Sequence, residues 1–171
     1  RQEVKAGTWA TDAATDTGMG GMLDSKWFSV SWRELSTFPQ QPFYPHNPAN
    51  PSSYHINYLE LFAVYWALTL WGAQLSGRNL KVVIHIDNTA AQGMITKLWG
   101  NTPYIPLLKQ LQLLCLRYDL KLQPTYINTK DNFLADALSR LKIQEFLRLR
   151  EDWRAQSKRA RDDKDWRLFS D

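Results

Sequence analysis

Four acidic residues stand where the surrounding sequence is otherwise uncharged. Asp12 lies within the β-rich segment WATDAA, and Glu60 lies in an apolar run with helical spacing. Asp87 ends the β-rich run VVIHI, and Asp136 stands between two alanines near the start of a helical stretch. A carboxylate in an apolar setting is costly unless it is paired with another group. We therefore consider the four acids as members of one site.

The chemistry that suits such a group is metal-dependent phosphodiester cleavage. Carboxylates that converge repel each other and raise each other's pKa, and divalent cations relieve that repulsion. Mg²⁺ prefers hard oxygen ligands and keeps some of its waters. In two-metal hydrolysis, one ion activates a water and a second, roughly 3.5–4 Å away, stabilises the leaving oxygen. The four acids therefore predict a site for two Mg²⁺ ions, for which Mn²⁺ can substitute.

Each acid also has a simpler interpretation. Asp12 fits a turn, Glu60 fits a helix capping box, and Asp87 fits a helix N-cap. Asp136 fits the first turn of a helix, where the dipole favours a negative charge. Each of these interpretations is adequate for one residue. It is the occurrence of all four acids in a suitable order of elements that favours a shared site.

The elements that position the acids can be predicted from hydrophobic patterning. Segments 9–14, 19–23 and 26–32 indicate three strands of an antiparallel meander around a Gly-rich turn. Residues 36–54 hold five of the eight prolines and are predicted to form a long loop, which would cover a substrate groove or pack on a neighbouring domain.

The second half of the chain alternates between helices and strands. We predict helices over 57–75, 89–98, 104–117 and 133–150, and strands over 81–86 and 120–127. Asn57 would cap the first helix in a capping box with Glu60, Asn88 and its neighbours the second, and Asn132 the last. The resulting order, β-β-β-α-β-α-α-β-α, predicts an α/β fold, a mixed sheet with helices on its faces.

Composition fits one globular domain with a charged appendage. The chain has 171 residues, of which 44% are hydrophobic, and a net charge of +4. Residues 140–171 hold ten Lys or Arg and seven Asp or Glu. We therefore predict a folded domain over 1–141 and a charged helical extension or linker over 142–171. The basic surplus suits a polyanionic partner, although a solvated helix rich in both signs explains it equally.

Cysteine content and hydropathy suggest the compartment. Cys115 is the one cysteine, which excludes an intrachain disulfide, and its apolar neighbours predict a buried, inert thiol. An intracellular location, in the cytoplasm or the nucleus, follows from this. The longest apolar stretch, 61–73, is too short to span a bilayer, so no membrane partner is expected.

The segments around the four acids resemble the ribonuclease H domains of retroelement reverse transcriptases. These segments are TDAATDTGMGGML, HINYLELFAVYWAL, VVIHIDNTAAQGMI and NFLADALSR. The similarity covers about residues 8–141. It is closest to the DIRS-type, tyrosine-recombinase retrotransposons, and Gypsy-type elements are related.

The resemblance implies a ribonuclease H-like fold with a five-stranded mixed sheet flanked by helices. It implies that Asp12, Glu60, Asp87 and Asp136 are the catalytic and metal-binding residues of an endonuclease for the RNA strand of RNA–DNA hybrids, which leaves a 3′-hydroxyl. It also implies that the chain belongs to a longer polyprotein, with a reverse transcriptase domain upstream and a recombinase or other element domain downstream.

Polar residues beside the acids are candidates for substrate contact, since selection of a hybrid requires sensing 2′-hydroxyl groups on one strand. Arg140 and the basic tail would meet phosphates, although Arg140 would serve equally as a cap of the last helix. The predicted substrate-binding residues are Thr15, Asn88, Thr89, Asn132 and Arg140.

The sequence departs from the cellular ribonuclease H pattern. No histidine lies in the turn 126–131, and we interpret His55 and His85 as structural. No basic protrusion is present, because residues 99–103 hold neither Lys nor Arg. A competing hypothesis is therefore a catalytically silent domain that binds nucleic acid or another domain of the polyprotein. The presence of all four acids argues against it.

Overall fold

The computed structural model describes residues 9–39, 41–76 and 80–163. Its strands are β1 (Trp9–Ala13), β2 (Gly18–Leu23), β3 (Lys26–Ser31), β4 (Leu80–Ile86) and β5 (Leu120–Tyr126). Its α-helices are α1 (Trp32–Leu35), α2 (Ile56–Leu75), α3 (Thr89–Lys97), α4 (Ile105–Arg117), α5 (Phe133–Ser139) and α6 (Ile143–Asp163). Two short 3-10 helices are η1 (Pro51–Tyr54) and η2 (Thr102–Tyr104).

The five strands form one mixed sheet with the order β3-β2-β1-β4-β5. β1, β2 and β3 pair antiparallel, which confirms the predicted meander. β4 runs parallel to β1 on one side and to β5 on the other. This α/β topology is that of the ribonuclease H-like fold, as the resemblance implied. It brings the carboxyl ends of β1 and β4 to the same edge of the sheet.

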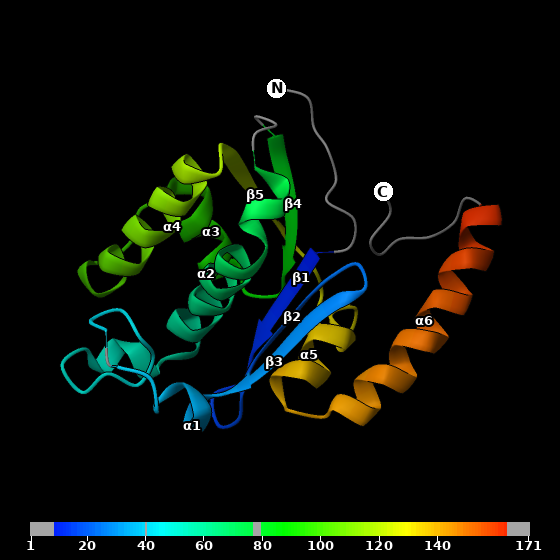
Figure 1. The fold of residues 1–171 in the computed structure, drawn as a ribbon, viewed down its shortest axis with the longest axis horizontal. Coiled ribbons are helices and arrows are strands. Elements are labelled where there is room, and N and C mark those ends of the chain that lie inside the picture. Colours follow the sequence, from blue (N-terminus) through cyan, green and yellow to red (C-terminus); the bar gives the residue numbers. More distant parts are fainter. Residues whose placement is uncertain (1–8, 40, 77–79, 164–171) are drawn as a thin grey trace.

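Helices cover both faces of the sheet (Figure 1). On one face, α2, α3 and α4 enclose the larger core, in which Trp9, Phe62 and Leu68 are fully buried. On the other face, α5 and the beginning of α6 pack around a smaller core that includes Met22 and Phe146. Helix α2 is apolar on most sides because it packs against the sheet, α3 and α4 at once.

Helix α2 begins one residue earlier than predicted, and its cap is a different residue. His55 is the N-cap, and its Nδ1 accepts a hydrogen bond of 3.1 Å from the backbone N–H of Asn57. The predicted capping box of Asn57 and Glu60 is therefore wrong. The structural role predicted for His55 is confirmed, and the Glu60 side chain is free of the helix terminus.

The predicted helix over 133–150 is interrupted. Helix α5 ends at Ser139, Leu141 has a left-handed φ of 62°, and α6 begins at Ile143. Hydroxyl groups of the meander hold the end of α5. Ser29 Oγ donates to the carbonyl of Leu138 (2.6 Å), and Thr17 Oγ1 donates to the carbonyl of Ser139 (2.7 Å). These contacts satisfy the last carbonyl groups of the helix. Because the donors lie far away in the sequence, no local pattern predicts where the helix ends.

The Pro-rich segment packs against its own domain. The Tyr58 hydroxyl on α2 donates to the carbonyl of Phe43, whose ring lies 5.4 Å from that of Tyr65 on the same helix. Asn50 Nδ2 donates to the carbonyl of Pro103 in η2 (3.3 Å). The described residues of the segment are irregular as predicted, apart from η1, and the preceding strand ends at Ser31 rather than at residue 32.

The beginning of the charged C-terminal segment also packs on the sheet. Phe146 on α6 is fully buried, its ring lies 5.5 Å from that of Trp27 on β3, and Arg150 lies over it. Residues 164–171 lie outside the described part of the chain, and a domain boundary near residue 142 stays a prediction. None of the described helices is long and apolar enough to cross a membrane. Cys115 is half-buried, and burial raises its pKa to about 11, so the thiolate is scarce near neutral pH.

One glycine sets how closely α5 approaches the sheet. Gly20 on β2 pairs with Asp12, and a Cβ at Gly20 would lie 2.3 Å from the Cβ of Leu138. We expect Gly20→Ala to push α5 away and to lower the free energy of unfolding by about 1–3 kcal/mol. Gly93 on α3 is the matched control, because its Cβ would meet nothing within 4 Å.

Gly93→Ala should leave stability unchanged or raise it by about 0.5–1 kcal/mol, since glycine is a poor residue inside a helix. Urea unfolding of the two variants beside the wild-type chain measures both effects. Equal stability of Gly20→Ala and Gly93→Ala would contradict this account of the close approach.

Candidate active site

Three of the four acids meet where β1, β4 and α2 come together. Asp12 is the fourth residue of β1, Asp87 directly follows β4, and Glu60 lies in the second turn of α2. One carboxylate oxygen from each lies within 4.8 Å of the others. Because β1 and β4 are parallel, their carboxyl ends deliver two acids to one edge, and α2 adds the third. We call Asp12, Glu60 and Asp87 the acidic triad.

A single backbone amide ties two members of the triad together. The N–H of Ala13 donates to Asp12 Oδ1 (2.9 Å) and to Glu60 Oε1 (3.1 Å). Asp12 and Glu60 are 4% and 3% exposed, whereas Asp87 is half-buried. The triad is therefore a buried floor with one more accessible member.

The triad suits a cation. Glu60 Oε2 is buried without a hydrogen-bond partner, and no Lys or Arg among the described residues forms an ion pair with the triad. Three converging carboxylates offer only oxygen ligands, the type that Mg²⁺ and Mn²⁺ prefer. A divalent ion held by these side chains would be coordinated by the unpartnered Glu60 oxygen and would neutralise the repulsion between the carboxylates.

The electrostatics of the free triad express the same repulsion. Burial raises the pKa of Asp12 to about 8, with the charges of Asp87 and Asp136 adding to the effect and the hydrogen bond with Glu60 opposing it. Burial also raises the pKa of Glu60 well above its usual value, and the charge of Asp12 raises it further. The pKa of Asp87 is raised mainly by burial. Without a cation, the triad therefore retains protons at neutral pH.

The fourth acid, Asp136, lies beside the triad but outside it. It lines the same cleft, and its charge raises the pKa of Asp12 and of Asp87. Its Oδ1 accepts a hydrogen bond of 3.1 Å from Arg140 Nε in an i,i+4 ion pair. Three of the four acids therefore lie in one close group, as the resemblance implied. The fourth, Asp136, lines the same cleft but is paired with Arg140.

The cleft above the triad has a volume of about 510 Å³. Three of the five predicted substrate contacts line it: Thr15, Asn88 and Arg140. Sequence reasoning missed several other lining residues: Asp16, Thr17, Ile56 and Thr129. Asp16 and Thr17 lie in the turn after β1 and Thr129 in the turn before α5, and these turns meet only in the folded chain.

Two asparagines act on the walls of the site. Asn132 is 1% exposed, and its Nδ2 donates to the carbonyl of Thr11 on β1 (3.0 Å), which fixes the start of α5 beside the triad. Asn132 is the N-cap residue of α5 as predicted, but its side chain makes no capping hydrogen bond. Asn88 caps α3 as predicted, since its Oδ1 accepts from the N–H of Ala91 (2.8 Å).

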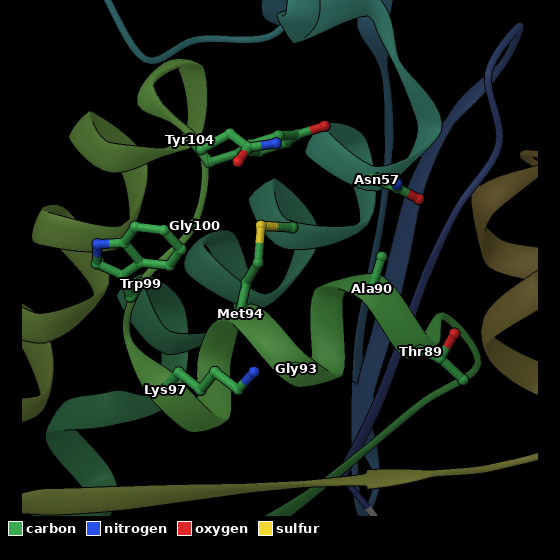
Figure 2. A pocket seen from close by; sticks show the side chains of 10 residues that line it. Asn57, Thr89, Ala90, Gly93, Met94, Lys97, Trp99, Gly100 and Tyr104 are labelled. Atoms are coloured by element: carbon green, nitrogen blue, oxygen red, sulfur yellow. The ribbon is translucent and has the colours of Figure 1, made fainter.

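A second hollow of about 360 Å³ lies between α3 and the segment leading to α4, and Asn57 on α2 also lines it (Figure 2). Asn88 Nδ2 donates to Asn57 Oδ1 (2.9 Å), which links the walls of the two hollows. The hollow is lined by Thr89, Lys97, Trp99 and Tyr104 among others, and the Trp99 side chain is 66% exposed. Thr89, the fourth predicted contact, lies here rather than in the cleft.

Comparison with known proteins adds no assignment. No protein-family model matches the chain, and no curated protein sequence is significantly similar to it. The fold and the site define the class on their own: an α/β protein of ribonuclease H-like fold with a buried acidic triad that is suited to a metal ion.

Proposed function

We propose that the chain is a metal-dependent endonuclease that hydrolyses the RNA strand of RNA–DNA hybrids during reverse transcription of a retrotransposon. The observation that carries the proposal is the acidic triad at the neighbouring carboxyl ends of β1 and β4, which includes a buried Glu60 oxygen without a hydrogen-bond partner. A buried cluster of three carboxylates destabilises a protein, and a metal ion compensates for it.

The chain's own residues have distinct parts in the proposed reaction. Asp12 and Asp87 would hold both Mg²⁺ ions, and Glu60 and Asp136 would each complete the ligands of one ion. The bound ions supply an activated water and stabilisation of the leaving oxygen. The Ala13 amide holds the Asp12 and Glu60 carboxylates in place, and Asn132 fixes β1 against α5. Thr15 and Asn88 line the cleft and would contact the sugars and phosphates of the RNA strand.

The second hollow supports a nucleic-acid substrate. The sugars of a duplex pack against exposed aromatic rings, and a neighbouring lysine attracts phosphate. Lys97 and Trp99 offer these groups at the C-terminal end of α3, opposite the end that begins with Thr89, so a duplex seated on the cleft would continue along α3 (Figure 2). The hollow thereby offers binding surface that the missing basic protrusion would otherwise supply.

The biological setting proposed here rests on the resemblance of the sequence segments. The chain would be one domain of a retroelement polyprotein with a reverse transcriptase domain upstream, and it would act inside the cell, in the cytoplasm or the nucleus. The cofactor would be Mg²⁺, for which Mn²⁺ can substitute because both ions accept carboxylate and water ligands.

The proposal is tested with a labelled RNA–DNA hybrid, incubated with the chain in Mg²⁺ or Mn²⁺, beside duplex DNA and duplex RNA. We expect cleavage of the RNA strand of the hybrid alone, with products that end in a 3′-hydroxyl. Cleavage of duplex DNA instead would indicate a different nuclease. Absence of cleavage together with absence of metal binding by calorimetry would leave the silent binding domain as the better hypothesis.

Trp99→Ala should weaken binding of the hybrid. The side chain is largely exposed and supports no core, so its loss removes a contact surface for the sugars of the hybrid without unfolding the chain. Burial of part of an aromatic side chain contributes about 1–2 kcal/mol, which corresponds to roughly a 5- to 30-fold increase in Kd on its removal. Fluorescence anisotropy of a labelled hybrid in Ca²⁺ measures the change.

The control for Trp99→Ala is Leu116→Ala, which removes an apolar side chain that is 71% exposed on α4. Leu116 lines neither the cleft nor the second hollow. It should leave the Kd unchanged. An equal effect of both variants, or none from Trp99→Ala, would mean that the second hollow does not bind the hybrid.

A further inference from the structure

We propose that Arg140 holds the fourth carboxylate, Asp136, away from metal in the free protein, so that the second ion binds weakly until a substrate phosphate takes over the guanidinium. This inference rests on the proposed function, because it concerns how the same site acquires its second ion. Arg140 is thereby assigned a positioning role rather than a catalytic one.

The geometry separates the acids into two groups. The triad oxygens lie within 4.8 Å of one another and have no cationic partner among the described residues, whereas Asp136 is outside this group and is already paired. The pair joins Arg140 Nε and Asp136 Oδ1 at 3.1 Å, and both residues line the cleft. The triad is therefore free to bind one ion, whereas Asp136, the additional ligand for a second ion, is already bound by Arg140.

The backbone keeps the two partners of the pair together. Arg140 is the C-cap of α5, and its N–H donates to the carbonyl of Asp136 (3.1 Å). Ser139 Oγ donates to the same carbonyl (2.7 Å), and the carbonyl of Ser139 is held by Thr17. The end of α5 is thus fixed to the sheet, and this holds the backbone of Arg140 at the wall of the cleft.

The competition follows from charge. A guanidinium on Oδ1 of Asp136 and a divalent cation on the same carboxylate repel each other, so the Arg140 contact opposes binding of the second ion. The Arg140 and Asp136 side chains are 53% and 34% exposed, so the pair is weak and reversible. A phosphate of the nucleic acid is a stronger acceptor for the displaced guanidinium than water is, because arginine binds phosphate through charge-assisted hydrogen bonds.

The first test is a titration of the metal-free chain with Mn²⁺ alone. Calorimetry measures the heat of binding, and electron paramagnetic resonance measures the concentration of free Mn²⁺. We expect a tighter ion at the triad and a weaker second one in the wild-type chain. Arg140→Gln should tighten the weaker ion by about two- to fivefold and leave the tighter ion unchanged. Arg140→Lys, which keeps the positive charge, should bind the weaker ion as the wild-type chain does.

Arg148→Gln is the matched control. Arg148 forms the same kind of i,i+4 ion pair, with Asp152 at 3.8 Å, but it lies on α6 and does not line the cleft. The variant has the same change in net charge and should bind both ions with wild-type affinity. An equal gain in Arg148→Gln would show that overall charge, not the pair in the cleft, sets the affinity, and would overturn the inference.

The second test uses the hybrid at a saturating concentration. If substrate phosphate releases Arg140 from Asp136, the wild-type chain and Arg140→Gln should need the same Mg²⁺ concentration for half-maximal cleavage. A persistent difference would overturn the release by substrate. If Arg140→Gln binds the tighter ion and its affinity for the weaker ion equals that of the wild-type chain, the inference about Arg140 alone is overturned. Failure of the wild-type chain to bind any ion would overturn the proposed function as well.

Discussion

Replacement of Asp87 by asparagine is expected to abolish cleavage of the RNA strand of a hybrid, with a loss of about 10²- to 10³-fold or more. Loss of a group that merely orients a metal ligand costs about 10- to 100-fold, and loss of one preorganised electrostatic group in an active site costs about 10²- to 10³-fold. Asp87 is a proposed ligand itself and the most accessible member of the triad. Asparagine has the same shape but carries no charge, so the variant tests the charge.

The structure makes this variant a clean one. Asp87 is half-buried, and its pKa is raised because of burial and the charge of Asp136, so removing its charge relieves repulsion. We therefore expect Asp87→Asn to fold at least as stably as the wild-type chain when no metal is present. Single-turnover cleavage of the labelled hybrid in Mg²⁺ measures the activity, and a Mn²⁺ titration shows whether metal binding is lost with it.

Asp131→Asn is the control for the loss of one negative charge. Asp131 is exposed in the turn before α5 and does not line the cleft. The variant should cleave at the wild-type rate. Wild-type activity in Asp87→Asn, or an equal loss in Asp131→Asn, would contradict the assignment of the triad as the reactive site.

Much of the triad could be predicted because two of its acids lie in or directly after strands that are recognisable from their β-rich sequence. Asp12 lies near the end of one uncharged β-rich run and Asp87 directly follows another, and carboxyl ends of parallel strands meet at one edge of a sheet. Glu60 could be predicted as an acid on a buried helix, but the same position also fitted a capping box. Only the structure decides between the two, because the cap is His55 and the Glu60 carboxylate reaches the amide of Ala13.

What the sequence could not reveal depends on contacts between distant segments. Helix α5 ends where Ser29 and Thr17, more than a hundred residues earlier, bind its last carbonyl groups. The 99–103 segment has no basic residue, and its composition does not disclose that Trp99 faces a hollow with Lys97. Such features arise from tertiary packing, which overrides local propensity and leaves no periodic pattern.

The second large effect is expected in stability rather than in activity: the metal-free chain should become less stable as the pH rises from about 4 to about 8. The pKa of Asp12 is about 8 in the folded chain, against 3.8 for the free side chain. Between these values the folded state holds a proton that the unfolded state has released. Raising the pH therefore favours unfolding, by up to about 1.4 kcal/mol for each pH unit from one such group.

Urea unfolding of chelator-treated protein between pH 5 and pH 8 measures this dependence, and Asp12→Asn should make it shallower. Asp131→Asn should retain the wild-type dependence, because its carboxylate is exposed. A wild-type chain whose stability is flat or rises across this range would contradict the burial of protonated carboxylates in the triad.

Metal should reverse the trend. A divalent ion binds the deprotonated triad, so it competes with protons and stabilises the folded chain most strongly at high pH, where the free triad is least stable. With saturating Mg²⁺ or Mn²⁺, we expect the gain in free energy of unfolding at pH 8 to exceed the gain at pH 5. The repulsion that destabilises the empty site is then the source of its metal affinity, and Asp12→Asn should lose both together. A gain from metal that is equal at the two pH values would indicate an ion bound somewhere other than the triad.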